Sequence, residues 1–256
     1  MSNPTRILFV AGEATPFAEV TDMAKLVRTL PEHLQEAGNY ETRIMMPRYG
    51  TISERRSRLH EVIRLSGTEV PMGEDVETLK VKVASIPGVR LQVYFMDSVR
   101  YFKRKGIFAD KQGKTFEDNA ARALFFARAT LATIRKLGWG PDVVHAFGSM
   151  SAFVPMLLQT EYGEDELLRK AKVIYTPNDV DLDAELTSDF AEEMGLNAGG
   201  PLEPTMTALG LAYTDAAIYP PTLAPPADEA QFGAEPEEMV EQASALYDQM
   251  LSEVPA

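Results

Sequence analysis

The feature that most constrains the fold of this chain is a repeated alternation between short apolar runs and helical patterns. Apolar runs that predict buried strands lie at residues 7–11, 42–46, 91–96, 143–146, 173–176 and 216–219. Patterns with helical spacing lie between several of them, at residues 23–37, 118–137 and 149–162. Strands that alternate with helices are typical of a parallel, doubly wound sheet, so the predicted fold class is α/β.

Three segments depart from this alternation. Residues 60–86 alternate apolar and polar side chains, which predicts antiparallel strands that extend the edge of the sheet. Residues 220–236 are rich in proline and are expected to form an extended tether. Residues 237–256 predict an acidic amphipathic helix. The chain is therefore expected to divide into a domain at 1–219, the tether at 220–236 and the C-terminal helix at 237–256.

Composition excludes several classes of protein. With 256 residues the chain can bury a large core, and with no cysteine it has neither disulfides nor thiolate metal sites. The histidines His33, His60 and His145 are scattered singly, so no metal site is predicted. We find no charged and apolar leader and no apolar run long enough for a membrane helix, so a cytoplasmic location without membrane association is expected.

Charge is distributed unevenly along the chain. All 25 Lys and Arg residues lie at or before Lys172, whereas residues 173–256 hold 17 of the 38 acids. This asymmetry argues against nucleic-acid binding by the last third. It indicates either an interaction surface or the acidic surface of a protein adapted to high salt, and both alternatives stay open.

Two basic stretches stand out against the net charge of −13. Residues 47–64 hold five arginines, and residues 100–106 hold four basic side chains, each stretch interleaved with tyrosine or phenylalanine. The basic side chains are Arg48, Arg55, Arg56, Arg58, Arg64, Arg100, Lys103, Arg104 and Lys105. These stretches could bind a phosphate polymer or RNA. The favoured interpretation is that they form solvated loops, because the overall negative charge of the protein repels polyanions. No nucleic-acid partner is therefore predicted.

Candidate site residues lie where strands of the predicted sheet end, which is where open parallel sheets bind ligands. Glu13 follows the first strand, His145 precedes a strand-to-helix junction, and Asp118 and Asn119 begin a helix. Each has a structural alternative: His145 can bond a neighbouring backbone group, and Asp118 and Asn119 can cap their helix. No nucleotide-binding, hydrolase or metal-binding motif is present, so no cofactor is predicted.

The loop after the first strand raises a specific question. In a nucleotide-binding α/β domain this loop would close on a phosphate through glycine N–H groups and a helix N-terminus. Here the loop contains one glycine, Gly12, and three acids, Glu13, Glu19 and Asp22. Like charge at this position predicts that the loop does not hold a phosphate.

Several motifs together indicate a family. The chain contains, in order, the stretches RILFVAGEATPFAEV, MPRYG, EDNAAR and GWGPDVVHA. From Arg6 to Tyr219 it resembles the N-terminal half of bacterial glycogen and starch synthases, and most of all the short, single-domain glycogen synthase-like proteins. The resemblance implies a Rossmann-like domain, the acceptor half of a two-domain glycosyltransferase that transfers glucose from ADP-glucose to an α-1,4-glucan. The family's donor-side groups belong to a second domain and are expected to be missing here.

The resemblance also assigns the candidate residues. Glu13, Asp118, Asn119 and His145 match the family pattern and could bind glucan hydroxyls, since carboxylates and amides are good acceptors for them. Other family positions are degenerate. A lysine and a glycine pair that approach the nucleotide phosphates in the family are replaced, and so are histidines of a HAHDW and a TIHN motif. The degenerate positions are Glu19, Thr21, Asp22, Phe147, Ser149 and Asn178.

Three hypotheses follow from these matches and departures. The favoured one is a glycogen synthase-like protein without catalytic residues of its own, which binds an α-glucan or a protein of glycogen metabolism. The second is a glucosyltransferase that completes its cleft with a partner chain. The third is an interaction module whose former cleft is occupied by its own acidic tail. The sequence leaves the oligomeric state open.

Overall fold

The computed structural model describes residues 4–89, 91–180, 182, 184, 186–197 and 202–252. Within them a ten-stranded sheet has at its centre six parallel strands in the order β6-β2-β1-β7-β8-β9. These strands are β1 (Thr5–Ala11), β2 (Tyr40–Pro47), β6 (Gln92–Asp97), β7 (Val143–Phe147), β8 (Lys172–Thr176) and β9 (Ala216–Tyr219). The strand order reverses between β1 and β7, which confirms the predicted doubly wound, Rossmann-like sheet.

The sheet is extended at both edges. On one side β5 (Asp75–Ser85) pairs antiparallel with β6, and both β3 (His60–Glu61) and β4 (Thr68–Met72) pair antiparallel with β5. The predicted antiparallel extension at residues 60–86 is thus confirmed. On the other side β10 (Ala230–Gln231) pairs parallel with β9, so a short strand lies within the segment expected to form a tether.

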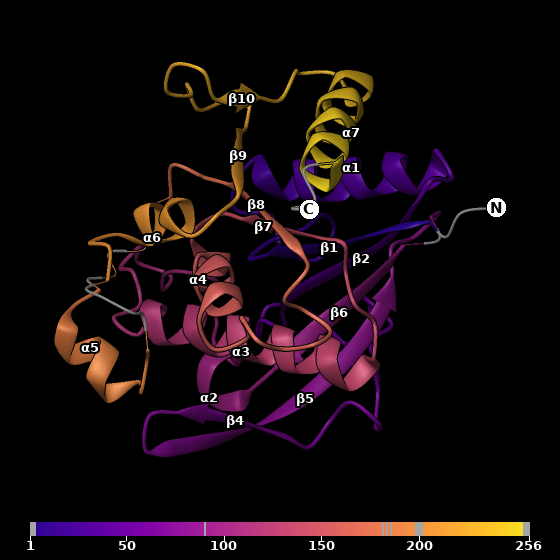
Figure 1. Ribbon diagram of the computed structural model, residues 1–256. Coiled ribbons are helices and arrows are strands. Elements are labelled where there is room, and N and C mark those ends of the chain that lie inside the picture. The colour runs from indigo at the N-terminus through magenta and orange to yellow at the C-terminus, as the bar shows by residue number, and fades with distance from the viewer. Residues whose placement is uncertain are drawn as a thin grey trace.

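Helices cover both faces of the sheet (Figure 1). One face carries α1 (Met23–Glu36) and α7 (Pro236–Ser252), which pack on each other. The other carries α2 (Val99–Phe102), α3 (Asn119–Leu137), the 3₁₀ turn η1 (Ser149–Ser151) and α4 (Phe153–Gln159). Two short helices follow: α6 (Met206–Ala212) packs on α4, and α5 (Ser188–Glu193) lies further out, where Phe190 contacts Phe153 of α4 (Figure 1).

These helices correspond to the predicted patterns with local differences. The pattern at residues 149–162 forms two pieces, η1 and α4, instead of one helix. The acidic C-terminal pattern forms α7, although its last four residues, 253–256, lie outside the described residues. The division into domain, tether and helix stays a prediction.

The core lies on both sides of the central strands because those strands are apolar on both faces. Residues 7–11 of β1 are all fully buried, as expected for a parallel strand between two helical layers. On α1 the buried residues Leu26, Leu30 and Leu34 recur at helical spacing and face the sheet. The helix α3 ends at Gly138, whose φ of 64° gives the left-handed cap that a side chain would disfavour.

Candidate functional site

The candidate site is the crevice at the carboxyl ends of β1, β7 and β8. The strand register places Ala11 beside Phe147, and Phe147 beside Thr176, so the loops that follow the three strands meet at one edge of the sheet. The chain turns there at Gly148, which has a φ of 70° and would bring a Cβ to 2.9 Å from the Asn178 side chain. Glycine is therefore required for this close approach.

Glu13 is buried in the crevice with only 3% of its surface exposed. Its Oε2 accepts hydrogen bonds from the backbone N–H groups of Val20 (2.6 Å) and Thr21 (2.9 Å), and its Oε1 accepts one from the Thr21 hydroxyl (2.6 Å). The loop between β1 and α1 is thus folded around an internal carboxylate. Two backbone N–H groups of this loop are therefore already bonded to a carboxylate of the chain.

The acids Glu19 and Asp22 of the same loop are exposed. Asp22 precedes α1 and forms an ion pair of 2.9 Å with Lys25. The hydrogen bond that Lys25 donates to Asp22 raises the pKa of Lys25. The nearest cation at the start of α1 is therefore already paired with a carboxylate of this chain.

The EDNAAR motif holds the segment that precedes α3. Asp118 receives a two-pronged ion pair from Arg104. Asn119 is fully buried, and its Nδ2 donates to the carbonyl oxygens of Phe108 (2.9 Å) and Leu182 (3.4 Å). Both side chains have partners within the chain, which supports a structural role for them. Glucan binding by Asp118 and Asn119 stays a prediction.

Arg122, the last residue of the motif, is also fully buried. It donates to the carbonyl oxygens of Tyr101 (2.8 Å) and Ile107 (2.7 Å) and to Asn119 Oδ1. Burial lowers the pKa of its guanidinium. The motif therefore fixes residues 101–108 against the start of α3, and sequence reasoning missed this role of Arg122 although its place in EDNAAR was visible.

His145 lies in β7 and is fully buried beneath the C-terminal helix. Nδ1 lies 2.8 Å from the Tyr247 hydroxyl of α7, and Nε2 lies 2.8 Å from the Thr176 hydroxyl. Its ring stacks on Phe147 with 4.0 Å between centroids. Burial lowers the pKa of His145 to about 3, so the imidazole is neutral at physiological pH.

The other degenerate positions also make internal contacts. Phe147 is buried in a stack with Phe9 and His145. The amide oxygen of Asn178 accepts hydrogen bonds from the Ser149 backbone N–H (3.1 Å) and hydroxyl (3.0 Å), which joins the loops after β7 and β8. Glu13, His145 and the EDNAAR residues thus bond to different parts of the chain.

A pocket of about 530 Å³ remains in the crevice. It lies between the start of α1, the loop after β8, the loop after β9 and the start of α7. Its polar lining includes Thr21, Asp22, Asn178 and Asp179, and its apolar lining includes Pro220, Pro221 and Met239. Lys25 is the only Lys or Arg among the described lining residues, and it is the partner of Asp22.

Within the described part of the chain, no group of three or more His, Cys, Asp or Glu side chains is arranged to hold a metal ion. No helix among the described residues has both the length and the apolar character needed to cross a membrane.

The motifs and the doubly wound sheet agree with comparison against known families. The chain belongs to the family described as the starch synthase catalytic domain, whose model matches residues 6–215. The resemblance seen in the sequence is thereby confirmed.

Curated relatives match the same part of the chain. Over 176 residues it is 39% identical to a glycogen synthase from Pelodictyon phaeoclathratiforme, an alignment that covers 68% of this chain and 36% of the relative. Over 172 residues it is 40% identical to a glycogen synthase from Chlorobium luteolum, covering 67% and 35%. The alignments thus span about a third of the length of these relatives and lie within their N-terminal half.

A solved structure shares the fold. The catalytic domain of Starch Synthase IV from Arabidopsis thaliana, bound to ADP and acarbose, superposes with a TM-score of 0.70 at 17% identity. The match covers 97% of this chain and 50% of the other. It confirms the fold of one half of a two-domain glycosyltransferase.

Proposed function

We propose that this chain binds an α-glucan in the crevice at the carboxyl edge of its sheet and does not itself catalyse glucosyl transfer. The proposal combines membership of the glycogen and starch synthase family with the chemistry of the crevice. It places the protein in glycogen metabolism, in the cytoplasm, as the sequence predicts.

The observation that carries the proposal is the acidic loop between β1 and α1. Its exposed acids Glu19 and Asp22 stand where the resemblance implies a lysine and a glycine, and Asp22 lines the pocket. Glu13 holds the loop in place through the N–H groups of Val20 and Thr21, so a nucleotide diphosphate in the pocket would lie close to Asp22. Like charges in a partly desolvated site cost several kcal/mol as an order of magnitude, which argues against binding of a nucleotide sugar here.

The remaining pocket suits a neutral ligand rich in hydroxyl groups. Asp22, Asn178 and Asp179 provide carboxylate and amide oxygens that accept hydrogen bonds from sugar hydroxyls. Proline and methionine side chains provide apolar surface for the faces of sugar rings. Its volume of about 530 Å³ lies within the common range for small-molecule sites and suits a short oligosaccharide end.

The hydrogen bond between His145 and Tyr247 favours a second role for the C-terminal helix. By packing on α1 and covering His145, α7 occupies part of the face beside the crevice. This supports the hypothesis that the chain's own tail fills space that a substrate or second domain would otherwise use. The two ideas are compatible, because the pocket lies at the start of α7 and His145 lies under its later turns.

Isothermal titration with maltoheptaose tests the proposal. The wild-type protein should bind it, and Asp179→Ala should weaken binding about tenfold, since a hydrogen bond to a charged group contributes about 1.5–3 kcal/mol. Glu166→Ala is the matched control. Glu166 is an exposed acid in the turn before β8, so it lies at the amino end of that strand, whereas the crevice lies at the carboxyl end. This control should bind like the wild type.

A parallel assay with ADP-glucose and glycogen tests the absence of transfer. No glucose should be incorporated by the purified protein, and ADP should not compete with maltoheptaose. Incorporation that appears only in cell extract would favour the alternative in which a partner chain completes the cleft. Absence of maltoheptaose binding together with active transfer would overturn the proposal.

A further inference from the structure

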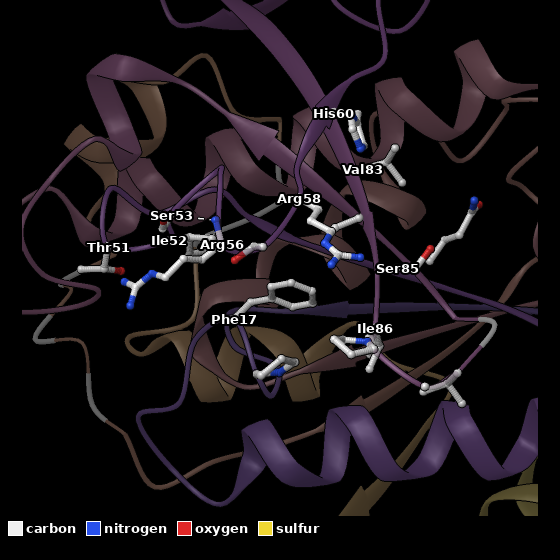
Figure 2. Close-up of a pocket in the computed structure, with 17 residues that line it drawn as sticks. Phe17, Thr51, Ile52, Ser53, Arg56, Arg58, His60, Val83, Ser85 and Ile86 are labelled. Carbon is white, nitrogen blue, oxygen red and sulfur yellow. Dashed lines mark hydrogen bonds between the residues drawn. The ribbon is translucent and has the colours of Figure 1, made fainter.

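A second and larger cavity, which shares no lining residue with the crevice pocket, lies beside the antiparallel extension of the sheet (Figure 2). It has a volume of about 1130 Å³ and is open to solvent. Arg56 and Arg58 come from the loop before β3, His60 from β3, and Phe17 from the loop after β1. We call this cavity the arginine pocket.

The cations of the arginine pocket have no counter-ion among the residues that the structure describes. No Asp or Glu is among its described lining residues, and neither Arg56 nor Arg58 forms an ion pair with the described part of the chain. The acid of the same loop, Glu54, is bound instead by Arg48 and Lys82, each at 2.6 Å. The hydrogen bond from Lys82 lowers the pKa of Glu54, so this carboxylate remains ionised and engaged elsewhere. Two unpaired guanidinium groups in a protein of net charge −13 indicate a place for an anion.

Arg58 adopts an unusual backbone conformation. Its φ is 50°, in the left-handed region that non-glycine residues rarely occupy. Such conformations cost about 1–3 kcal/mol and concentrate at functional sites. Glycine adopts this backbone conformation at a lower cost than arginine does. The presence of arginine therefore indicates a functional role for its side chain.

Other lining groups suit a sugar. Phe17 is partly buried and contacts the core through Phe95, in an edge-on arrangement with 5.0 Å between ring centroids. It also lines the arginine pocket, where an aromatic ring can pack against a sugar ring. Ser53, Ser57 and Ser85 supply hydroxyl groups.

We propose that the arginine pocket binds a sugar that carries a phosphate monoester. The phosphate contacts Arg58, because guanidinium groups match the geometry of phosphate oxygens, and the sugar ring packs on Phe17, which lies beside Arg58 (Figure 2). Arg56 extends towards Thr51 at the other end of the pocket and contributes positive potential (Figure 2). The phosphate can belong to a free hexose phosphate or to a phosphorylated unit of a glucan chain. The pocket is separate from the crevice, so this inference does not depend on the proposed function.

Isothermal titration with glucose 6-phosphate at low salt tests the inference. Wild-type protein should bind it more tightly than inorganic phosphate and should not bind glucose at the same concentrations. Arg58→Gln should weaken binding at least tenfold, and the double variant with Arg56→Gln should abolish it. Arg55→Gln is the matched control: Arg55 is exposed in the same loop but does not line the pocket, so binding should be unchanged.

Arg58→Gly separates binding from folding. Glycine relieves the backbone strain at a φ of 50°, so the melting temperature should stay or rise while glucose 6-phosphate binding is lost. Phosphorylated maltoheptaose distinguishes the two sources of the phosphate. Binding at least tenfold tighter than that of glucose 6-phosphate assigns the pocket to a phosphorylated glucan, whereas equal binding assigns it to a free hexose phosphate.

Three results would overturn the inference. One is the absence of binding by either phosphorylated sugar at millimolar concentration. Another is unchanged binding by the double arginine variant. The third is equally tight binding of inorganic phosphate and glucose 6-phosphate, because it would show that the sugar ring contributes nothing to affinity. Asp179→Ala should leave this binding intact, which separates the pocket from the crevice.

Discussion

At the scale of single residues, polar side chains in the crevice mainly bond to other parts of this chain. Glu13 bonds the loop before α1, and His145 bonds β8 and α7. A buried polar group is costly when its partner is lost, so these residues make the crevice wall sensitive to substitution. Residues that the sequence identifies as candidates for ligand binding thus also have structural roles, which substitution can test.

Substitution of Glu13 should loosen the loop that it holds. In Glu13→Gln the amide keeps one acceptor oxygen but loses the charge that strengthens the bonds to Val20 and Thr21. We expect the free energy of unfolding to fall by about 1–3 kcal/mol in urea titration, with faster hydrogen exchange at both amides. Glu19→Gln, an exposed neighbour, should change stability by less than about 0.5 kcal/mol. Equal effects of the two variants would contradict this role of Glu13.

His145 should make stability depend on pH. The unfolded chain binds a proton near the ordinary histidine pKa of 6.5, whereas the folded protein does so only near 3. Below pH 6.5 the unfolded state therefore binds more protons, and the free energy of unfolding falls as pH falls towards 3, by at most about 1.4 kcal/mol per pH unit from this residue. In urea titrations between pH 7 and 4, His145→Gln should show a shallower decline than the wild type. Identical slopes would show that His145 titrates normally in the folded protein.

At the scale of elements, the EDNAAR motif connects α3 to the segment 101–108 through two arginines. Arg122 is fully buried and bonds backbone carbonyl oxygens, whereas Arg104 is partly exposed and pairs with Asp118. Water can replace the ion pair of Arg104 with Asp118, but it cannot reach the buried hydrogen bonds of Arg122. The two arginines should therefore contribute unequally to the free energy of unfolding.

Comparison of two variants tests this inequality. Arg122→Met leaves the buried Tyr101 carbonyl oxygen, the partly buried Ile107 carbonyl oxygen and the Asn119 amide oxygen without this donor. We therefore expect a loss of about 3 kcal/mol or more in the free energy of unfolding. Arg104→Met should cost about 1 kcal/mol, because solvent reaches its ion pair with Asp118. Guanidinium chloride unfolding measures both. A larger loss for Arg104→Met would contradict the assignment.

Periodicity predicted most elements but not all of their contacts. Apolar runs identified the six parallel strands, since buried strands need apolar side chains on both faces. Proline-rich composition hid the short strand β10, which pairs through very few residues. The pairing of His145 with Tyr247 joins positions 102 residues apart, and no local pattern could predict it. Sequence thus located the crevice but not which of its polar groups were already bonded.

At the scale of the whole molecule, the acidic C-terminal helix is part of the domain's packing. Ala243, Tyr247 and Met250 are the buried residues of α7, and they lie on the face that meets α1 and His145. The acidic character of the last third therefore coexists with an apolar stripe. The stripe explains why this segment packs onto the sheet despite its charge.

Deletion of residues 236–256 should destabilise the protein. Loss of two large buried side chains and one alanine should lower the free energy of unfolding by about 3–6 kcal/mol. Tyr247→Phe keeps the ring and removes only the hydrogen bond to His145, so it should cost about 1 kcal/mol. Thermal unfolding of both variants separates packing from hydrogen bonding. Unchanged melting after the deletion would contradict a structural role for α7.

The central claim is that this member of the starch synthase family binds α-glucan without transferring glucose. The most direct measurement is native electrophoresis of the pure protein through gels with and without glycogen, at two salt concentrations because its net charge is −13. The account predicts retardation by glycogen that free maltoheptaose reverses at both salt concentrations. Mobility that glycogen leaves unchanged would contradict it.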